Sequence, residues 1–149
     1  MKTIVLILIG MCSLLTISQN NKKTAIEPHN LEGVWELQNQ YMYQDNHISD
    51  TLSNQNGYRQ VKMYSQGKVM WTRFDPKDNN EWFGYGTYTI KDGVLEERLE
   101  YASGPMMKIL DTTKVFRFEI LVEKDSYQQI DVDENGHYYH SENYKRVQK

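Results

Sequence analysis

Cysteine is nearly absent from this sequence, with one in 149 residues, Cys12, close to the N-terminus. Neither a disulfide framework nor a cysteine zinc site is therefore available to the rest of the chain. Proline and glycine are also scarce, with 3 and 9 residues, which excludes collagen-like and proline-rich architectures. The net charge is only −3, with an isoelectric point near 5.8, and this argues against a general binder of nucleic acids or anionic membranes.

What the composition does contain suits one packed domain. Hydrophobic residues make up 39% of the chain, aromatic residues 12% and charged residues 25%, so a hydrophobic core is available. A chain of this length is expected to form a single domain.

The N-terminus has the pattern of a secretory signal peptide. Lys2 supplies the positive start, an apolar run follows from Ile4 to Leu15, and Thr16-Ile17-Ser18 provides small residues before a cleavage after Ser18. The run is too short for a lasting transmembrane span. Lipidation of Cys12 is the alternative, which the bulky Met11 before the cysteine disfavours.

These signals divide the chain into three parts. We expect a signal peptide over residues 1–18, a polar linker over 19–30 and the folded domain over 31–149. The protein is then exported, to the periplasm or the cell exterior.

After residue 30, apolar and polar residues alternate with a period of two, which is typical of β-strands. Turn signals bound these segments, including the tight hairpins Gln66-Gly67 and Lys91-Asp92-Gly93. Asp45–Asn56 is expected to be a polar loop and Ala102–Thr112 a second long loop. The expected strands are Gly33–Gln44, Tyr58–Ser65, Lys68–Asp75, Glu81–Lys91, Val94–Tyr101, Thr113–Lys124, Tyr127–Val132 and His137–Val147.

Eight strands joined mostly by short hairpins predict an all-β fold, a single antiparallel eight-stranded up-and-down β-barrel. An open β-sandwich is the competing architecture. A barrel of eight strands is either filled by its own side chains or holds one small ligand. Interior volume therefore decides between a binding protein and a solid scaffold.

Gly33-Val34-Trp35, at the beginning of the first strand, resembles the Gly-x-Trp opening of lipocalins and the wider calycin group. In that group an arginine of the last strand packs over the tryptophan at the closed end of the barrel, and Arg146 is the residue that matches. The middle of the chain is similar to an uncharacterised family of secreted lipocalin-like proteins from Bacteroides-type bacteria, through Val69–Asp75, Gly84–Thr89 and Glu97–Tyr101. The resemblance implies a calycin-type barrel, structural closing roles for Trp35 and Arg146, and small-molecule binding.

Strand parity identifies side chains that share the inner face of the expected barrel. Trp71 and Arg73 lie on one face of their strand, and Glu97 lies among apolar neighbours on another. A carboxylate in that setting needs a cation, a hydrogen-bond donor or water. Arg73 and Glu97 are therefore expected either to form an internal ion pair that fixes the barrel or to orient a polar group of a ligand. The predicted ligand-binding residues are Trp71, Arg73, Tyr88, Glu97, Tyr101 and Phe118.

Other polar patterns indicate structural roles. Glu96 and Glu100, with Arg98 between them, are typical of a solvated, charge-paired outer face. Gly84 and Gly86 permit a barrel strand to coil sharply or another group to approach closely. His137 and His140 would point to opposite faces of a strand, so no metal site is expected.

The catalytic motifs that would indicate a common enzyme class are absent: the sequence has no Gly-x-Ser-x-Gly elbow, Gly-rich phosphate loop or dinucleotide fingerprint. We predict a non-enzymatic protein without cofactor that binds a small, partly apolar molecule inside the barrel and no nucleic acid. The alternative is an envelope module for protein–protein interaction, with a packed barrel and functional loops at 45–56 and 102–112; Met106 and Met107 in the second loop are expected to be exposed. A third hypothesis is a hydrolase or isomerase with Glu97 as its base.

Overall fold

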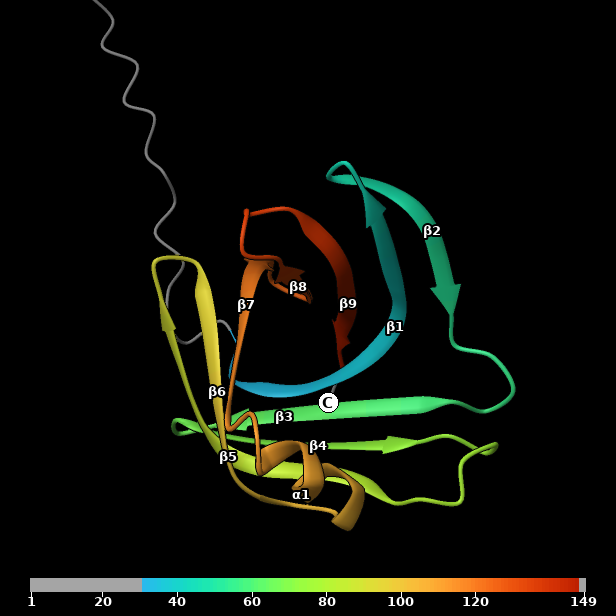
Figure 1. Ribbon diagram of the computed structural model, residues 1–149, viewed down its shortest axis with the longest axis vertical. Helices are drawn as coiled ribbons and strands as arrows, with labels where there is room; N and C mark the ends of the chain where they lie inside the picture. Colours follow the sequence, from blue (N-terminus) through green and yellow to red (C-terminus); the bar gives the residue numbers. More distant parts are fainter. Residues whose placement is uncertain (1–30, 148–149) are drawn as a thin grey trace, which may run out of the picture.

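The computed structural model describes residues 31–147. The predicted signal peptide over 1–18, which includes Cys12, and the predicted linker over 19–30 lie outside the described residues. Figure 1 shows the elements of the described chain. They are β1 (Gly33–Gln44), β2 (His47–Ser53), β3 (Arg59–Ser65), β4 (Lys68–Phe74), β5 (Trp82–Lys91), β6 (Val94–Ala102), α1 (Gly104–Leu110), β7 (Val115–Val122), β8 (Ser126–Val132) and β9 (Tyr138–Arg146).

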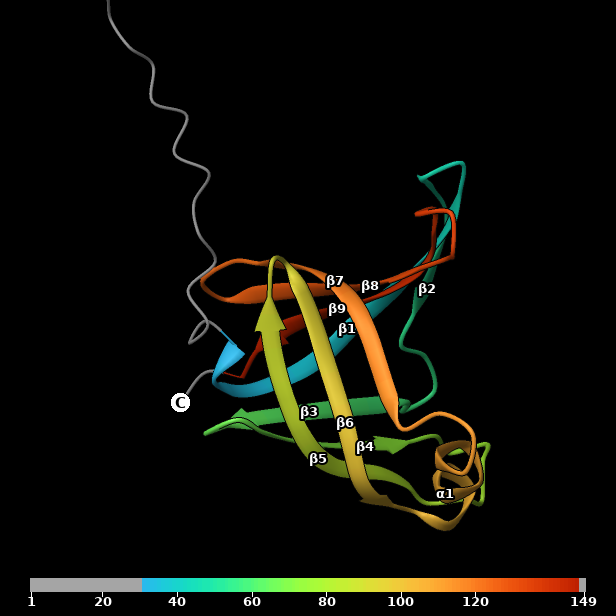
Figure 2. The same ribbon diagram turned by 60° about the vertical axis from the view of Figure 1, so that its left-hand side comes forward.

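The strands form one antiparallel sheet in the order β2-β1-β3-β4-β5-β6-β7-β8-β9, and pairing of β1 with β9 closes the sheet on itself. The closed ring contains β1 and β3 to β9, while β2 pairs with β1 outside it (Figures 1 and 2). The expected all-β antiparallel fold is confirmed. The strands form one closed sheet, whereas the competing β-sandwich would require two sheets packed face to face.

The hairpins set the strand boundaries. Gln66 and Gly67 have φ values of 49° and 76°, and Asp92 and Gly93 have 52° and 78°. Two consecutive left-handed residues form the turn that matches the twist of the flanking strands. The chain therefore reverses after two residues at both places, as the sequence predicted.

The prediction of an irregular loop at 45–56 is wrong, because β2 lies within it. Asp45 and Asn46, with φ values of 51° and 61°, form a further two-residue hairpin that returns the chain along β1. All seven residues of β2 are exposed, so no apolar alternation marks this strand in the sequence.

The loop predicted at 102–112 contains the helix α1, with Pro105 in its first turn. Met106 and Leu110 of this helix are buried, which corrects the expectation that Met106 is exposed. Met107 is 40% exposed, as expected. The helix packs against β5 and β6 and covers one end of the ring (Figure 2).

β1 changes its partner halfway along its length. Its residues Gly33–Glu36 pair with β3, whereas its residues from Asn39 onward pair with β2. β9 stays paired with β1 on the other side throughout. The ring is therefore tight near Trp35 and splayed at the opposite end, where β1 has left β3.

Aromatic side chains fill the tight end. The Trp35 ring packs edge-on against Tyr127, with centroids 4.9 Å apart, and Tyr127 stacks on Tyr144 at 4.7 Å. The Trp35 indole donates a hydrogen bond of 2.7 Å to the carbonyl oxygen of Leu31. The buried ring is thus held by packing and by a satisfied polar atom.

Arg146 covers the same tryptophan. Its guanidinium carbon lies 3.9 Å from the Trp35 ring centroid, and its nitrogens donate to the carbonyl oxygens of Glu32 and Lys124. This is the contact that the resemblance to lipocalins implied. It ties the beginning of β1 to the end of β9, where the ring closes.

Two glycines allow close approach on β5. A Cβ on Gly86 would lie 2.0 Å from the carbonyl oxygen of Arg98, and a Cβ on Gly84 would lie 2.7 Å from the indole nitrogen of Trp71. Both residues are therefore needed for the close contacts that the ring makes there.

The outer face of β6 carries charges, as predicted. Glu96 lies 2.9 Å from Arg117 and 3.8 Å from Arg98, and Glu100 pairs with Lys68 at 2.7 Å. These pairs are solvent-exposed, so each contributes little to stability.

Candidate functional site

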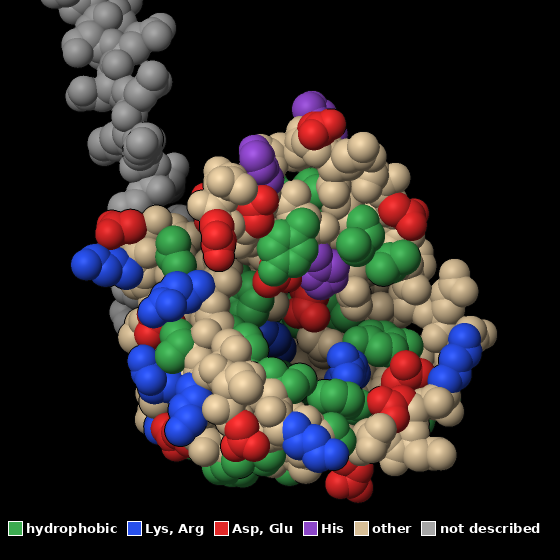
Figure 3. Space-filling model, in the orientation of Figure 1, with side chains coloured by type: hydrophobic (Ala, Val, Ile, Leu, Met, Phe, Trp, Pro, Cys, Tyr) green, Lys and Arg blue, Asp and Glu red, His purple; other side chains and the backbone are tan. Residues whose placement is uncertain are grey.

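The splayed half of the ring contains an open cavity of about 290 Å³. Seen in space-filling form, this face has a central hollow with acidic and basic side chains inside it (Figure 3). The volume is close to the lower end of small-molecule pockets, which hold about 300–1,000 Å³. Its lining consists of Gln60, Lys62, Trp71, Arg73, Trp82, Glu97, Leu99, Met106, Ile109, Phe116, Phe118, Gln129, Asp131 and Glu142.

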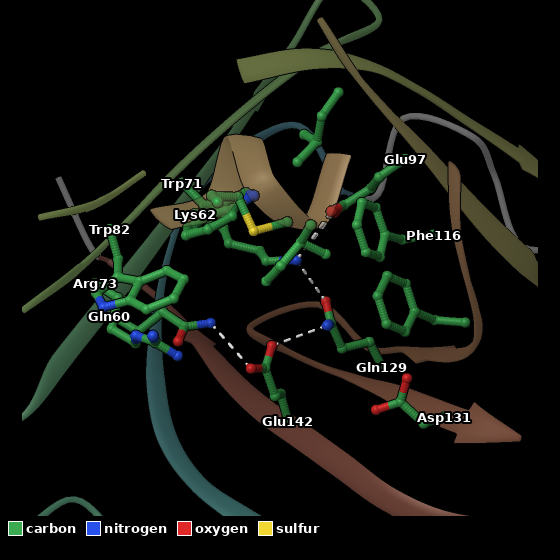
Figure 4. Close-up of a pocket in the computed structure, with 14 residues that line it drawn as sticks. Gln60, Lys62, Trp71, Arg73, Trp82, Glu97, Phe116, Gln129, Asp131 and Glu142 are labelled. Carbon is green, nitrogen blue, oxygen red and sulfur yellow. Dashed lines mark hydrogen bonds and ion pairs between the residues drawn. The ribbon is translucent and has the colours of Figure 1, made fainter. Parts of the chain in front are cut away.

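Aromatic side chains form the two sides of the cavity. Trp71 of β4 and Trp82 of β5 lie on one side, and Phe116 of β7 lies on the other (Figure 4). Phe118, two residues further along β7, also lines the cavity. Met106 of α1 contributes to the lining from the covered end. The apolar walls favour a ligand with an apolar body.

A buried ion pair lies at the bottom of the cavity. Lys62 Nζ donates to both carboxylate oxygens of Glu97, at 3.0 and 3.2 Å, and to Gln129 Oε1 at 2.9 Å. The two charged side chains are 4% and 3% exposed. Because the three ammonium protons are all engaged, Lys62 and Glu97 neutralise each other within the protein.

Tyr64 strengthens this pair from the core side. Its hydroxyl donates to Glu97 Oε1 at 2.5 Å. Burial, together with the negative charge of Glu97, raises the pKa of Tyr64 well above its ordinary value. Tyr64 therefore remains a neutral donor throughout the physiological range.

A second cluster of polar side chains surrounds Glu142 of β9. Gln60 Nε2 donates to Glu142 Oε1 at 3.1 Å, and Gln129 Nε2 and the Tyr144 hydroxyl donate to Glu142 Oε2 at 2.8 and 2.6 Å. All three donors are neutral, so they provide hydrogen bonds to the carboxylate but no opposite charge.

Arg73 does not meet Glu97, and the expected ion pair between them is wrong. On β5, Glu97 lies opposite Tyr88 whereas Arg73 lies opposite Trp82, so the two are at different heights in the ring. Lys62 takes the place that was expected for Arg73. The Arg73 guanidinium carbon instead lies 4.2 Å from the Trp82 ring centroid, and its Nε is buried without a hydrogen-bond partner.

Four of the six predicted ligand-binding residues line the cavity, namely Trp71, Arg73, Glu97 and Phe118. Tyr88 does not; it is buried in the core, with its ring centroid 4.9 Å from that of Tyr64. Tyr101 does not share the inner face either, since it is 54% exposed and packs beside Tyr85. A register shift between Tyr85 and Gly86 leaves one extra residue on β6, which reverses the parity before Tyr101.

The sequence analysis missed most polar residues of the cavity: Gln60, Lys62, Gln129 and Glu142, and also Trp82. On β3 the apolar residues Val61 and Met63 point outward, contrary to a simple hydrophobic pattern. The hairpin at Gln66-Gly67 supplies the missing signal, because it places Lys62 opposite Trp71. Once Trp71 is assigned to the inside, its partner Lys62 has to be there as well.

His140 lies on the same face of β9 as Glu142 and opposite Asp131, which lines the cavity. Its Nδ1 is 2.9 Å from Asp131 Oδ2, and its Nε2 is 3.0 Å from Gln40 Oε1. The hydrogen bond to Asp131 raises the pKa of His140 above its ordinary value. Among residues 31–147, no three His, Cys, Asp or Glu side chains are grouped so that they would hold a metal ion.

Comparison with known proteins adds a likeness of fold. No family model matches the chain, and no curated protein sequence matches it. The structure is similar to the crystal structure of an uncharacterized protein from Bacteroides eggerthii, with a TM-score of 0.52 and 12% sequence identity over 78% of this chain and 99% of that one. At this identity the likeness concerns the fold alone. Within the described residues, no helix has the length and apolar character needed to cross a membrane.

Proposed function

We propose that this protein binds a small, partly apolar molecule in the cavity of its ring, without catalysing a reaction. The observation that carries the proposal is the cavity itself, about 290 Å³ between Trp71 and Trp82 on one side and Phe116 and Phe118 on the other. A ring filled by its own side chains would leave no such space. Aromatic walls with a few placed polar groups are the usual composition of a small-molecule site.

The arrangement of Glu97 supports binding over catalysis. A general base needs a lone pair directed at the substrate. Both oxygens of Glu97 accept hydrogen bonds from Lys62, and Oε1 also accepts one from Tyr64. The Glu97 side chain is only 3% exposed and is ion-paired with Lys62, so it holds β3 and β6 together and is shielded from a substrate, and we assign it a structural role in the cavity floor.

The same proposal includes a lipocalin-like, calycin-type character and export to the periplasm or the cell exterior. The packing of Arg146 on Trp35, at the point where β9 meets β1, supports the first part. The leader pattern of residues 1–18 supports the second.

Protein–protein interaction is the second candidate function. Apolar side chains are exposed on the two segments that the sequence indicated: Ile48 and Leu52 of β2 are 54% and 45% exposed, and Ile109 of α1 is 41% exposed. Ile109 also lines the cavity, so part of this surface belongs to the binding site.

Native mass spectrometry of the protein isolated from its own cells, before and after organic extraction, tests the binding proposal. We expect an additional mass that extraction removes. Titration with indole, a neutral apolar probe, should then show binding to the extracted protein.

The substitution Leu99→Trp, which adds a ring to the cavity lining, should abolish indole binding. Met70→Trp is the matched control, because Met70 lies outside the ring and is 42% exposed. The absence of both an extractable mass and indole binding would contradict the proposal and favour the interaction module.

A further inference from the structure

Not all charged side chains that line the cavity form ion pairs. Of the charged side chains that line it, Lys62 pairs with Glu97, and Asp131 pairs with His140 at 2.9 Å. This leaves one cation, Arg73, and one anion, Glu142. No ion pair within residues 31–147 neutralises either of them by direct contact.

Arg73 has guanidinium N–H groups that can donate further hydrogen bonds. Its guanidinium lies over the Trp82 ring, and its buried Nε has no hydrogen-bond partner. The Trp82 indole donates to Asp78 at 2.6 Å, and Asp78 feels the positive charge of Arg73 without forming an ion pair with it. Because Nε is shielded from solvent, a ligand carboxylate would bind the terminal guanidinium nitrogens of this lining residue, which contacts the Tyr58 hydroxyl but forms no ion pair within residues 31–147.

Glu142 has acceptor capacity to spare. A carboxylate accepts about four hydrogen bonds. Glu142 receives three, from Gln60, Gln129 and Tyr144, and only the one from Gln60 reaches Oε1. An ammonium group of a ligand would supply the missing donor and the missing counter-charge.

The two unpaired charges lie on either side of Tyr58 and Gln60. The Tyr58 hydroxyl donates to Gln60 Oε1 at 3.0 Å, and Gln60 in turn donates to Glu142. Arg73 lowers and Glu142 raises the pKa of Tyr58, whose net rise is due mainly to burial, so both charges act on this one hydroxyl. Figure 4 shows Gln60 between Arg73 and Glu142 at the same side of the cavity.

From this arrangement we infer that the ligand is a small zwitterion with an apolar body, of the amino-acid type. Its carboxylate is bound by Arg73, its ammonium group by Glu142, and its apolar part lies between the tryptophan and phenylalanine walls. The volume of about 290 Å³ fits the body of a molecule of that size. This inference rests on the proposed function, since it specifies the ligand of the same cavity.

Three probes with the same phenyl group test the inference by calorimetric titration of the purified full-chain protein after extraction. L-Phenylalanine carries both charges, 3-phenylpropionate only the negative one and 2-phenylethylamine only the positive one. We expect L-phenylalanine to bind roughly 10- to 100-fold more tightly than either of the others, as a buried charged hydrogen bond provides.

Two variants assign the charges. Arg73→Gln should lower the affinity for L-phenylalanine at least to that for 2-phenylethylamine, whereas 2-phenylethylamine, which has no carboxylate, should lose much less affinity. Glu142→Gln should have the converse effect, with 3-phenylpropionate as the less affected probe. The wild-type comparison of the three probes remains decisive if either variant fails to fold.

Equal affinities for the three probes, or a singly charged probe that matches L-phenylalanine, would overturn the inference. So would the absence of L-phenylalanine binding in a protein that binds indole, and in that case the proposed function stands. If neither indole nor any charged probe binds and no mass is extracted, the proposed function itself has failed.

Discussion

Lys62 and Glu97 are the residues on which the interior of the ring depends most. Removing one partner of a buried ion pair leaves an uncompensated charge, which destabilises the folded state by about 3–5 kcal/mol. Lys62→Met should therefore lower the free energy of unfolding by about that amount, measured by denaturant titration. Lys68→Met is the matched control, because Lys68 and Glu100 form an exposed pair, with 45% of each side chain exposed, whose loss has a minor effect.

The double variant Lys62→Met/Glu97→Gln tests the coupling of the pair. The double variant should lose less unfolding free energy than the two single variants lose together, because it contains neither unpaired charge. Additive effects would mean that the two side chains do not interact in solution.

His140 links stability to pH. Its pKa is raised in the folded protein, chiefly by the hydrogen bond to Asp131, so protonation of His140 favours the folded state. This contribution is fully present below the unfolded pKa of about 6.5 and is lost as the pH rises through the higher folded value.

The stability difference between wild type and His140→Gln should accordingly be larger at acidic pH than above the folded pKa, when measured by thermal unfolding across that range. In an Asp131→Asn background the pH-dependent part of the difference should become smaller, because the hydrogen bond to Asp131 is the largest cause of the raised pKa of His140, whereas the charge of Glu142 remains. A difference that grows as the pH rises would show that the charged histidine does not stabilise the fold.

At the scale of single elements, β2 stands apart from the ring. It pairs with β1 alone, and all its residues are exposed. β3 has the same length of seven residues but is paired on both sides and alternates buried and exposed positions. Segments with few buried contacts open locally at low free energy.

Amide hydrogen exchange should therefore be fast over β2 and slow over β3, when followed by mass spectrometry of peptides. β3 is the internal control, since both segments are measured in the same sample. Equal protection of the two strands would mean that β2 is covered in solution.

The elements also show what a sequence pattern leaves open. Alternation and hairpin dipeptides predicted every strand of the ring with ends within two residues of those observed. The sequence pattern did not predict β2, because a strand that is exposed on both faces has no alternation of apolar and polar residues. Tyr101 was assigned to the wrong face because one extra residue in β6 reverses parity, and a bulge of this kind has no marker in the local sequence.

Considered as a whole, the molecule is one closed sheet with one continuous core. The tight end contains Trp35, whereas Trp71 and Trp82 lie at the cavity. Closure through β1 and β9 connects the two halves, so they are expected to unfold together.

A variant with Trp71→Phe and Trp82→Phe keeps Trp35 as its single tryptophan and reports on the tight end alone. Its fluorescence and its far-UV circular dichroism should show the same transition midpoint in denaturant. Separate midpoints would indicate that the tight end is a stability unit of its own.

The sequence by itself determined the eight strands of the ring, the two-residue hairpins at Gln66-Gly67 and Asp92-Gly93, and an antiparallel meander with a glycine–tryptophan beginning and an arginine near its end, because period-two patterns and turn chemistry are local properties. Only the tertiary structure decided that Lys62 rather than Arg73 reaches Glu97, that Glu142 and Gln129 face the same interior, and that a cavity remains between aromatic walls. These features depend on strand heights around the closed ring and on where β1 leaves β3. Such distances arise between residues far apart in the chain, and no local pattern encodes them.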